Sequence, residues 1–510
     1  MVMRVTQRNL YSTVVGRMNY SLSELMESNI QASSEKKVNK PSDDPVGTVR
    51  IMGFRDTIGQ LDQYRENISS AKGWLNLADN TMLQVNTIVT RCKELAEQGA
   101  TGTISAENRE QISYEVRQLF QQLIGLSNTS FEDNSLFAGH KTQTPAFEEA
   151  LWLTCNDGAV SNAAFSISGD TNSTILVQFA SNGNISTQPA FRYSDDGGAT
   201  WKTGTYTAIP GGGQRLNLGG VNVDLDDSVT VTASQNENDT DGTWLWIRPT
   251  ARYLGDDKDG VSVDPMQNTE VTGSAEGTWT RNVVVRIDET TTLADPAIRY
   301  SYSLDGGNTW VQSNVSSPDS LADSASFIVP GGVLTLTENT GNQLNEGDQF
   351  IIRPRTADIN VQISESQTVT VNGVGKDIFG GIYKEPGASN ASAVAIDGSI
   401  ERNLFETVGK LVGYLETNNQ SGCQEALESL RTSSESILNY AASVGGRENR
   451  LETADAILSS MQLDTDEQLS KVEDVDLAAL MTKLAQQELA YQAVLKSSSM
   501  IMQLSLVGMI

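Results

Sequence analysis

The sequence predicts a multidomain α+β protein in which both chain ends build a long α-helical coiled-coil rod, with two duplicated all-β domains inserted between them. Residues 54–96 carry apolar side chains at a seven-residue interval, and residues 423–458 carry a second series of this kind. From about residue 151 the apolar period falls from seven to two, with turn residues between short apolar runs. One helix cannot bury a narrow heptad stripe by itself, so the two series are expected to pack together.

Two heptad stripes define the predicted rod. In the first, one position of the repeat is filled by Phe54, Leu61, Ile68, Leu75, Met82, Val89 and Ala96, and the other by Tyr64, Ala71, Ala78, Val85 and Cys92. The second stripe consists of Cys423, Leu430, Ile437, Val444, Leu451 and Leu458. Segments far apart in the sequence are therefore expected to lie side by side.

A weaker amphipathic helix is expected over residues 5–34, where apolar side chains fall three or four residues apart among polar neighbours. Such a helix is marginal in water and orders only against partners. Residues 36–44 interrupt it, because Pro41 lacks the backbone N–H that a continuing helix needs. Asp44 and Pro45 then form a start signal for the long helix: a carboxylate that accepts free backbone N–H groups, followed by proline at the first helical position.

A helical hairpin is expected after the long helix. Residues 99–105 predict a turn, and Ser105 can begin the next helix. Its apolar face consists of Ile112, Val116, Leu119, Leu123 and Leu126. The loop at 128–139 then carries Phe131, Leu136 and Phe137, which are expected to pack on a neighbouring helix.

The β region contains an internal duplication. Residues 174–179 resemble 282–287, residues 188–194 resemble 295–301, and Arg248–Pro249 resembles Arg353–Pro354. Two β domains are therefore expected, over 151–270 and 271–375. Residues 45–150 with 376–463 form the predicted helical-bundle rod. Residues 1–44 with 464–510 form a terminal helical domain, whose last helix starts near residue 464 and carries Leu477, Leu484 and Tyr491 on its apolar stripe.

Each β repeat contains the box Ser-x-Asp-x-Gly-x-Thr-Trp. The two copies are Ser194, Asp196, Gly198, Thr200, Trp201 and Ser303, Asp305, Gly307, Thr309, Trp310. Asp and Gly suit a tight turn, the hydroxyls can bond its backbone, and Trp packs beneath. The box resembles the Asp-box of sialidases, whose copies stabilise turns away from the catalytic groups. The spacing of the two copies does not fit propeller blades, so a turn-stabilising role is favoured over a glycosidase. A surface that binds glycan or another protein stays open.

Composition narrows the function classes. Lys+Arg 36 and Asp+Glu 64 give a net charge of −28, which disfavours nucleic acid and anionic membrane surfaces as partners. Three scattered cysteines and one histidine, His140, argue against a disulfide framework, a multi-histidine metal site or a conventional catalytic triad. The acidic clusters around Asp224 and Asp256 offer oxygen ligands for calcium but match no defined loop. The first residues also lack the apolar stretch of a secretory signal peptide.

The two chain ends resemble a known family. Residues 33–47 are similar to the N-terminal signature of bacterial flagellins and their hook-associated relatives, and residues 444–452, 473–478 and 492–495 are similar to its C-terminal counterpart. The resemblance implies a structural part that assembles through its helices, without catalysis, cofactor or metal. The residues expected to join the end helices to the rod, or to form the assembly seam, are Asn39, Pro41, Asp43, Asp44, Pro45, Arg447, Glu448, Asn449, Arg450, Leu451, Leu477, Leu484 and Tyr491.

Two types within this family remain as alternatives. Residues 134–142, the opening residues 3–6 and Pro41 resemble the hook-associated type that forms the hook–filament junction, and residues 505–510 lack the Leu-Leu-Arg ending common in flagellins. The junction type is therefore favoured over the filament subunit, with Met3 as a candidate start. It implies export through the flagellar channel to an extracellular location on the flagellum. The implied partners are copies of the chain in a ring, another hook-associated junction protein, flagellin or the filament cap, and an export chaperone.

Overall fold

A computed structural model of the chain describes residues 7–507, except 162, 164, 211, 237–240, 258–260, 267, 269, 278, 280, 296, 319–323, 355–356 and 385–389. The candidate start at Met3 and the last three residues lie outside the described residues. Contacts divide the chain into two compact units. The first comprises Met1–Ala71, Val361–Val369 and Asn449–Ile510, and the second comprises Lys72–Asn360 and Thr370–Glu448.

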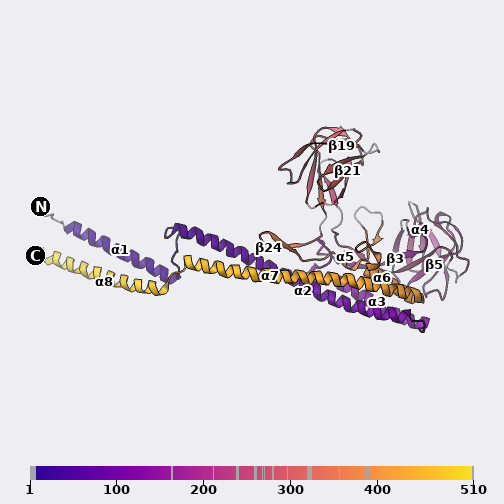
Figure 1. The fold of residues 1–510 in the computed structure, drawn as a ribbon, viewed down its shortest axis with the longest axis horizontal. Coiled ribbons are helices and arrows are strands. Elements are labelled where there is room, and N and C mark those ends of the chain that lie inside the picture. Colours follow the sequence, from indigo (N-terminus) through magenta and orange to yellow (C-terminus); the bar gives the residue numbers. More distant parts are fainter. Residues whose placement is uncertain are drawn as a thin grey trace. The chain divides into compact units, whose positions relative to one another are not determined.

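The long helices belong to the two ends of the sequence, and most strands lie between them in the chain (Figure 1). The helices are α1 (Gln7–Ser34), α2 (Pro45–Ala100), α3 (Ala106–Ser127), α4 (Gly158–Ser161), α5 (Gly375–Phe379), α6 (Leu404–Glu416), α7 (Gln420–Glu473) and α8 (Leu477–Val507). Short 3-10 turns occur at Ile185–Thr187 and Ile400–Arg402. Long terminal helices around a β-rich middle confirm the predicted fold class. Within the described residues, no helix is long and apolar enough to cross a membrane.

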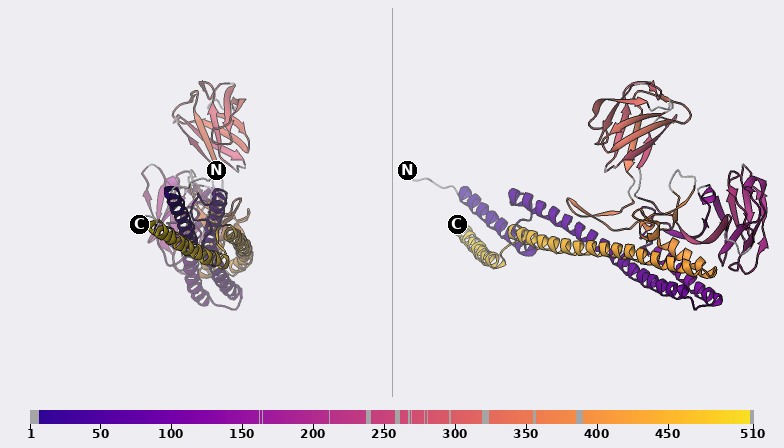
Figure 2. Two further views of the ribbon diagram at one scale, coloured as in Figure 1. Left: turned by 90° about the vertical axis from the view of Figure 1, so that its left-hand side faces the viewer. Right: turned by 45° about the vertical axis from the view of Figure 1, so that its right-hand side comes forward.

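The first unit is built from paired helices. Helix α1 packs along α8 (Figure 2). The N-terminal part of α2 lies against the C-terminal part of α7, where Arg65 bonds Asp455 (Nε–Oδ1 3.3 Å) and Gln462 (Nη1–Oε1 2.9 Å). Leu61, Ile68, Leu451 and Leu458 are buried, so the heptad stripes of both helices face inward, as predicted.

The last helix begins later than residue 464. Helix α7 continues to Glu473, and α8 starts at Leu477. No proline or glycine interrupts residues 464–473, so the helix persists after its heptad stripe fades. The break falls where Asp476 caps α8: its Oδ1 accepts the backbone N–H groups of Ala478 (2.9 Å) and Ala479 (3.1 Å).

In the second unit, parts of α2, α3, α6 and α7 share one hydrophobic core. Met82, Val89, Leu430 and Ile437 are at most 1% exposed, which confirms that this length of the two stripes is also buried. The two cysteines on the stripes, Cys92 and Cys423, are buried free thiols that pack as small apolar side chains. Burial raises the pKa of Cys92 to about 12 and that of Cys423 to about 11.

The predicted packing of the aromatic loop after α3 is confirmed. Its chain forms the small hairpin β1 (Ser130–Phe131) and β2 (Asn134–Ser135). The ring of Phe131 lies 5.8 Å from that of Trp74 on α2. Phe137 is fully buried, with its ring 5.2 Å from that of Phe379.

The first β repeat consists of two main sheets around one apolar core. One sheet has the order β27-β26-β13-β5-β7-β8, with β3 also paired to β13; the other has the order β4-β11-β10-β9. The strands are β3 (Phe147–Cys155), β4 (Phe165–Gly169), β5 (Ile175–Phe179), β6 (Gly183–Asn184), β7 (Phe191–Ser194), β8 (Lys202–Thr203), β9 (Thr205–Ala208), β10 (Gln214–Asn217), β11 (Val221–Leu225), β12 (Thr230–Val231), β13 (Trp244–Tyr253), β26 (Ile382–Tyr383) and β27 (Ser392–Ala393).

The second β repeat has its own core and one long sheet, in the order β14-β23-β16-β18-β19-β20-β21-β15. Its strands are β14 (Val261–Pro265), β15 (Val271–Gly277), β16 (Val283–Ile287), β17 (Thr291–Thr292), β18 (Ile298–Ser303), β19 (Val311–Pro318), β20 (Ser324–Val329), β21 (Gly332–Glu338), β22 (Gln343–Leu344) and β23 (Gln349–Pro354). Strand β14 pairs with β23, so this sheet begins before the division expected at residue 271. A separate hairpin, β24 (Asn360–Ser364) and β25 (Gln367–Thr370), follows.

Helix α6 packs against the first β repeat and connects it to the helical core of the second unit. Arg248 of β13 and Glu406 of α6 form a buried ion pair (Nη2–Oε2 2.6 Å), and Thr250 donates its hydroxyl to the same carboxylate (2.6 Å). The helix can approach the sheet closely because Gly409 and Gly413 face it. A Cβ on Gly409 would lie 2.1 Å from the carbonyl oxygen of Pro249.

Substitution of two neighbouring residues of α2 tests whether its heptad stripe faces the core. Met82 is 1% exposed and Leu83 is 57% exposed. Met82→Ala is expected to lower the free energy of unfolding by about 2–5 kcal/mol, because it removes buried methylene groups and leaves a cavity. Leu83→Ala, the matched control, is expected to change it by no more than about 0.5 kcal/mol. Denaturant unfolding followed by circular dichroism measures both, and equal effects would contradict the observed orientation of the stripe.

Candidate assembly site

The paired end helices bury only a thin seam. Leu480 of α8 is 3% exposed and Ser28 of α1 is 1% exposed. The other seam positions, including Val14, Leu25 and Tyr491, are only half-buried. Two helices packed in this way gain little apolar burial from each other, which leaves further burial available to additional partners.

The same helices also carry exposed apolar side chains outside the seam. Tyr20 is 67% exposed, Met26 59%, Met481 60% and Leu489 70%. Ile30, Leu477, Leu495 and Met500 are exposed as well. Clusters of exposed apolar side chains on a protein surface indicate a protein–protein contact surface.

One carboxylate organises the joint between the end helices and the longer helices of the first unit. Glu473, the last residue of α7, accepts hydrogen bonds from Lys36 and Arg55, and its side chain is only 5% exposed. Two backbone bonds run beside it: Lys37 N–H donates to the Glu473 carbonyl (2.7 Å), and Val475 N–H donates to the Glu35 carbonyl (3.1 Å). The link between α1 and α2 is thereby held to the link between α7 and α8.

Short-range caps shape the first of these links. Asp44 Oδ1 accepts the backbone N–H of Gly47 (2.9 Å) at the start of α2, with Pro45 as the first helical residue. A Cβ on Gly47 would lie 2.5 Å from Asp44 Oδ2, so a larger residue at this position would require the Asp44 side chain to shift. Asp43 Oδ2 accepts the N–H groups of Asn39 (3.1 Å) and Lys40 (2.9 Å). Pro41 lies in the turn that the Asp43 N–H closes onto the Lys40 carbonyl (2.9 Å).

The two Asp-box turns have the same hydrogen bonds in both β repeats. The serine hydroxyl donates to the aspartate Oδ1 at 2.7 Å in each copy, and accepts the Gly198 or Gly307 N–H at 2.8 Å. Thr200 and Thr309 donate both their N–H and their hydroxyl to Asp196 and Asp305 respectively. Each box closes a hairpin, between β7 and β8 or between β18 and β19.

The acidic clusters are engaged in ion pairs and caps. Asp224 pairs with Arg215 (2.7 Å), and Asp226 accepts from Ser228. Asp256 lies 3.4 Å from Lys141, and Asp257 lies 3.6 Å from Lys376. In the described part of the chain, no three His, Cys, Asp or Glu side chains are placed to hold a metal ion.

Comparison with known proteins finds a family model that matches the N-terminal part of the chain. The profile of the bacterial flagellin N-terminal helical region matches residues 6–142. These residues are similar to a flagellin N-terminal helical region.

The chain is similar to both junction and filament proteins of flagella. Flagellar hook-associated protein 3 of Escherichia coli is 28% identical over 148 residues, which cover 29% of this chain and 47% of that protein. Flagellin FlaB1 of Treponema pallidum is 31% identical over 113 residues, which cover 22% of this chain and 40% of that protein. The chain thus spans about half the length of the curated relatives it matches. The crystal structure of hook-associated protein 3 from Legionella pneumophila aligns with a TM-score of 0.32 and 14% identity, covering 83% of this chain and 98% of that one.

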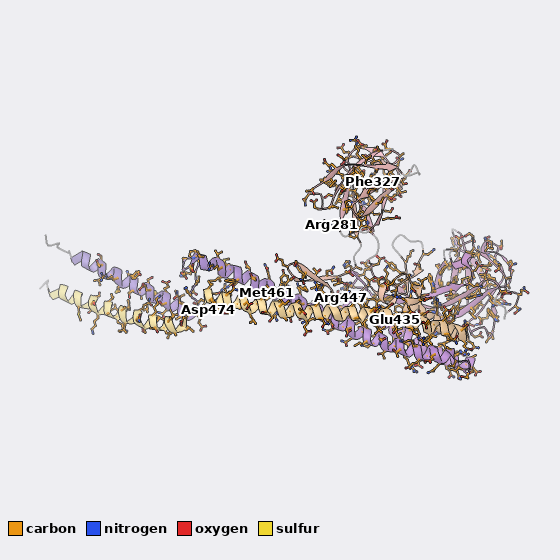
Figure 3. The ribbon with its side chains drawn as sticks, viewed as in Figure 1. Arg281, Phe327, Glu435, Arg447, Met461 and Asp474 are labelled. Atoms are coloured by element: carbon orange, nitrogen blue, oxygen red, sulfur yellow. The ribbon has the colours of Figure 1, made fainter. Side chains whose placement is uncertain are left out.

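The matched residues 6–142 contain the α1–α2 link. Glu473, which pairs with Lys36 and Arg55 there, is near the other chain end. Arg447, Glu448, Asn449 and Arg450, which the sequence placed at this joint, lie instead along α7 (Figure 3 labels Arg447). Because a helix rises about 1.5 Å per residue, Arg450 lies about 35 Å along α7 from Glu473. Arg447 donates to the Thr370 carbonyl (3.2 Å) and Arg450 to Gln367 Oε1 (3.5 Å). Both arginines therefore donate hydrogen bonds to the β24–β25 hairpin.

Glu473 begins the segment 473–478 that resembles the C-terminal family signature, but it is off the heptad stripe. Its partners Lys36 and Arg55 are distant in sequence, so the sequence did not single it out as a joint residue. Glu448 was singled out but has a different environment. The Oε1 atom of Glu448 is buried without a partner among the described residues. The pKa of Glu448 is raised mainly by burial and, to a smaller extent, by the negative charge of Asp79. Leu451 is fully buried in the seam, whereas Leu477 is 47% exposed.

Glu473→Gln tests the joint, because it keeps the shape of the side chain and removes the charge. The loss of a charge-assisted pair of about 1.5–3 kcal/mol is expected to speed amide exchange at Lys37 and Val475 by about tenfold or more. Glu467→Gln is the control, since Glu467 is exposed and pairs with Lys471 one turn along the same helix. Exchange mass spectrometry measures both variants. Unchanged amide exchange at residues 35–37 in Glu473→Gln would show that the Glu473 ion pairs do not hold the joint.

The Asp-box carboxylates give a second prediction. Burial raises the pKa of Asp196, but the bonds from Thr200 and Ser194 outweigh it and lower the pKa to about 2; bonds from Thr309 and Ser303 lower that of Asp305 to about 2. A lowered folded-state pKa stabilises the fold above the unfolded value of 3.8, and that stability is lost as pH falls toward 2. The double variant Asp196→Asn, Asp305→Asn is expected to melt below the wild type at neutral pH and to converge with it near pH 2 in calorimetry. A pH-independent difference would exclude this contribution.

Proposed function

We propose that this chain is a structural component of the bacterial flagellum, a hook-associated junction protein that joins the hook to the filament by helix–helix self-assembly. The observation that carries the proposal is the α1–α8 pair, which has a thin seam and apolar outer faces. The flagellin N-terminal helical region and the similarity to hook-associated protein 3 support it. The role requires no catalytic group and no cofactor.

In this proposal, residues 1–44 and 464–510 form the innermost layer of a tube. Neighbouring copies cover the exposed apolar faces of α1 and α8, and each Å² of apolar surface so buried contributes about 25 cal/mol. Leu484 and Tyr491 keep the pair together, while Leu477, Met481 and Leu489 meet the neighbours. Asp43, Asp44 and Pro45 set the angle of chain entry into α2, and Glu473 fixes it.

The remaining parts have assigned roles as well. Residues 45–150 with 376–463 form the next layer, and the β repeats project outward, where acidic surface keeps the assembly soluble. The partners are other copies in a ring, a second hook-associated protein, and flagellin or the filament cap. Export through the flagellar channel, with a chaperone that holds the marginal end helices, delivers the chain to the extracellular flagellum.

A filament subunit is the second candidate. The similarity to flagellin FlaB1 of Treponema pallidum, at 31% identity over 113 residues, favours it. The two functions differ in polymer length. A filament subunit forms long filaments from purified protein without other components, whereas a junction protein forms a collar of limited size that stops growing.

Deletion in the native host tests the junction role. Loss of the chain is expected to release flagellin into the medium while hooks remain intact, because the filament then lacks the protein that attaches it to the hook. Complementation with Leu489→Lys is expected to fail, since Leu489 is 70% exposed on α8 and a charge there cannot be buried by a neighbour. Val315→Lys, at a 57% exposed position of β19, is the matched control and is expected to restore motility. Hooks with normal filaments after deletion would reject the junction role.

A further inference from the structure

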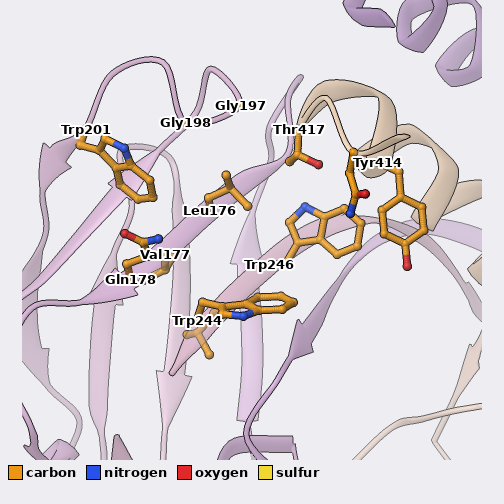
Figure 4. Close-up of a pocket in the computed structure, with 12 residues that line it drawn as sticks. Leu176, Val177, Gln178, Gly197, Gly198, Trp201, Trp244, Trp246, Tyr414 and Thr417 are labelled. Atoms are coloured by element: carbon orange, nitrogen blue, oxygen red, sulfur yellow. The ribbon is translucent and has the colours of Figure 1, made fainter. Parts of the chain in front are cut away.

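A cavity of about 310 Å³ opens on the first β repeat, beside the end of α6 (Figure 4). Trp201 follows the Asp-box turn, and Trp244 and Trp246 lie on β13. Tyr414 of α6 completes the aromatic wall, with its ring 5.0 Å from that of Trp246. Leu176 and Gln178 of β5 form the floor between the indoles, as Figure 4 shows.

The cavity combines flat apolar walls with uncharged polar groups. Its lining side chains include Gln178, Thr417 and Asn419 but no acid or base among the described residues. Thr417 donates its hydroxyl to the Gly413 carbonyl (2.8 Å), so its lone pairs remain to accept. Trp246 is 4% exposed, and its indole N–H has no partner among the described residues. In Figure 4 this nitrogen lies on the ring edge toward Leu176 and Thr417. An unpaired buried donor is costly unless something binds it.

The second β repeat shows that the scaffold does not need these indoles. Strand β13 pairs with β5 so that Trp244 faces Gln178 and Trp246 faces Leu176. Strand β23 pairs with β16 in the same register, with Gln349 opposite Arg286 and Ile351 opposite Val284. The duplicated sheet therefore holds Gln349 and Ile351 where the first repeat holds two tryptophans.

The tryptophan of the second box is also covered. The Arg286 guanidinium lies 4.2 Å from the ring centroid of Trp310, at the position where the first repeat has the neutral Gln178. In the first repeat, Arg192 lies farther off, at 5.4 Å from Trp201, and bonds the Gln178 side-chain oxygen (3.0 Å). The first repeat thus places two strand tryptophans beside its box tryptophan, where the second repeat has Gln349 and Ile351, on a turn with the same hydrogen bonds.

We propose that this cavity binds a neutral pyranose chain. A pyranose ring has apolar C–H faces that pack on indole rings, and hydroxyl edges that need hydrogen-bond partners, and the cavity presents both kinds of surface. Its volume lies at the lower end of the roughly 300–1,000 Å³ typical of ligand sites, enough for a short stretch of sugar. Uncharged walls in a chain of net charge −28 disfavour phosphorylated or carboxylated ligands. This binding activity is independent of the junction role.

Titration of the full-length chain with neutral oligosaccharides tests the proposal. The probes are hexasaccharides of β-linked glucose, α-linked glucose, β-linked N-acetylglucosamine and α-linked mannose, followed by calorimetry and intrinsic tryptophan fluorescence. At least one is expected to bind saturably at concentrations below about 10 mM. Trp244→Gln and Trp246→Ile install the residues of the second repeat, so both variants are expected to fold. Each is expected to weaken binding by about tenfold or more.

Trp310→Ala is the matched control, because it removes the corresponding box tryptophan outside the cavity, and it is expected to leave binding unchanged. Trp246→Phe keeps an aromatic ring without the N–H and is expected to weaken binding several-fold. No binding by any of the four sugars would overturn the proposal, and so would equal binding by Trp244→Gln. Tighter binding of a galacturonate oligomer, or binding of an indole-containing peptide with no sugar bound, would assign the cavity to a different ligand class and reject this one.

Discussion

The helical part of this chain depends on one constraint: the heptad stripes of α2 and α7 are too narrow to stabilise either helix alone, so the two ends of the chain must meet. Helix α1 pairs with α8, and α2 pairs with α7 in each of the two units. A stripe of a/d positions buries too little surface for a lone helix to persist in water. The β repeats are consequently insertions, since the chain must leave the helical layer after α3 and return to it at α6.

Features with a local or periodic cause could be predicted from the sequence. The buried stripe through Met82 and Val89, the Asp44–Pro45 start of α2 and the Ser105 cap of α3 each follow from residues close to one another in the chain. The Glu473 joint could not be predicted, because Lys36 and Glu473 meet only after both chain ends have folded. The start of α8 was misplaced for a related reason. Helix α7 continues to Glu473, beyond the last residue of its heptad stripe. The start of α8 is indicated only by the cap at Asp476.

The β repeats illustrate how a duplication preserves a scaffold while its surfaces change. Their strand registers and box hydrogen bonds coincide. The arginine before the shared proline does not: Arg248 is buried against Glu406 of α6, whereas Arg353 pairs with Asp264 and is half exposed. A buried ion pair requires complete burial and good geometry to offset desolvation, so it fixes one repeat on the helices. The duplication and the box turns could be predicted from the sequence, but these attachments depend on which neighbour each sheet meets.

The end helices bury only part of their apolar surface within a single chain. A seam as deep as that of α2 and α7 would use the apolar surface internally and leave little to drive association. A shallower seam with serine at the buried position Ser28 keeps α1 and α8 paired but leaves side chains such as Tyr20 and Leu489 for other partners. Exposed apolar faces promote indiscriminate aggregation, and a large negative charge opposes it through long-range repulsion. Close, well-matched helical contacts can overcome that repulsion, because apolar burial acts at contact while salt screens the charges over about 10 Å. The weak seam and the acidic composition together therefore favour ordered assembly over random association.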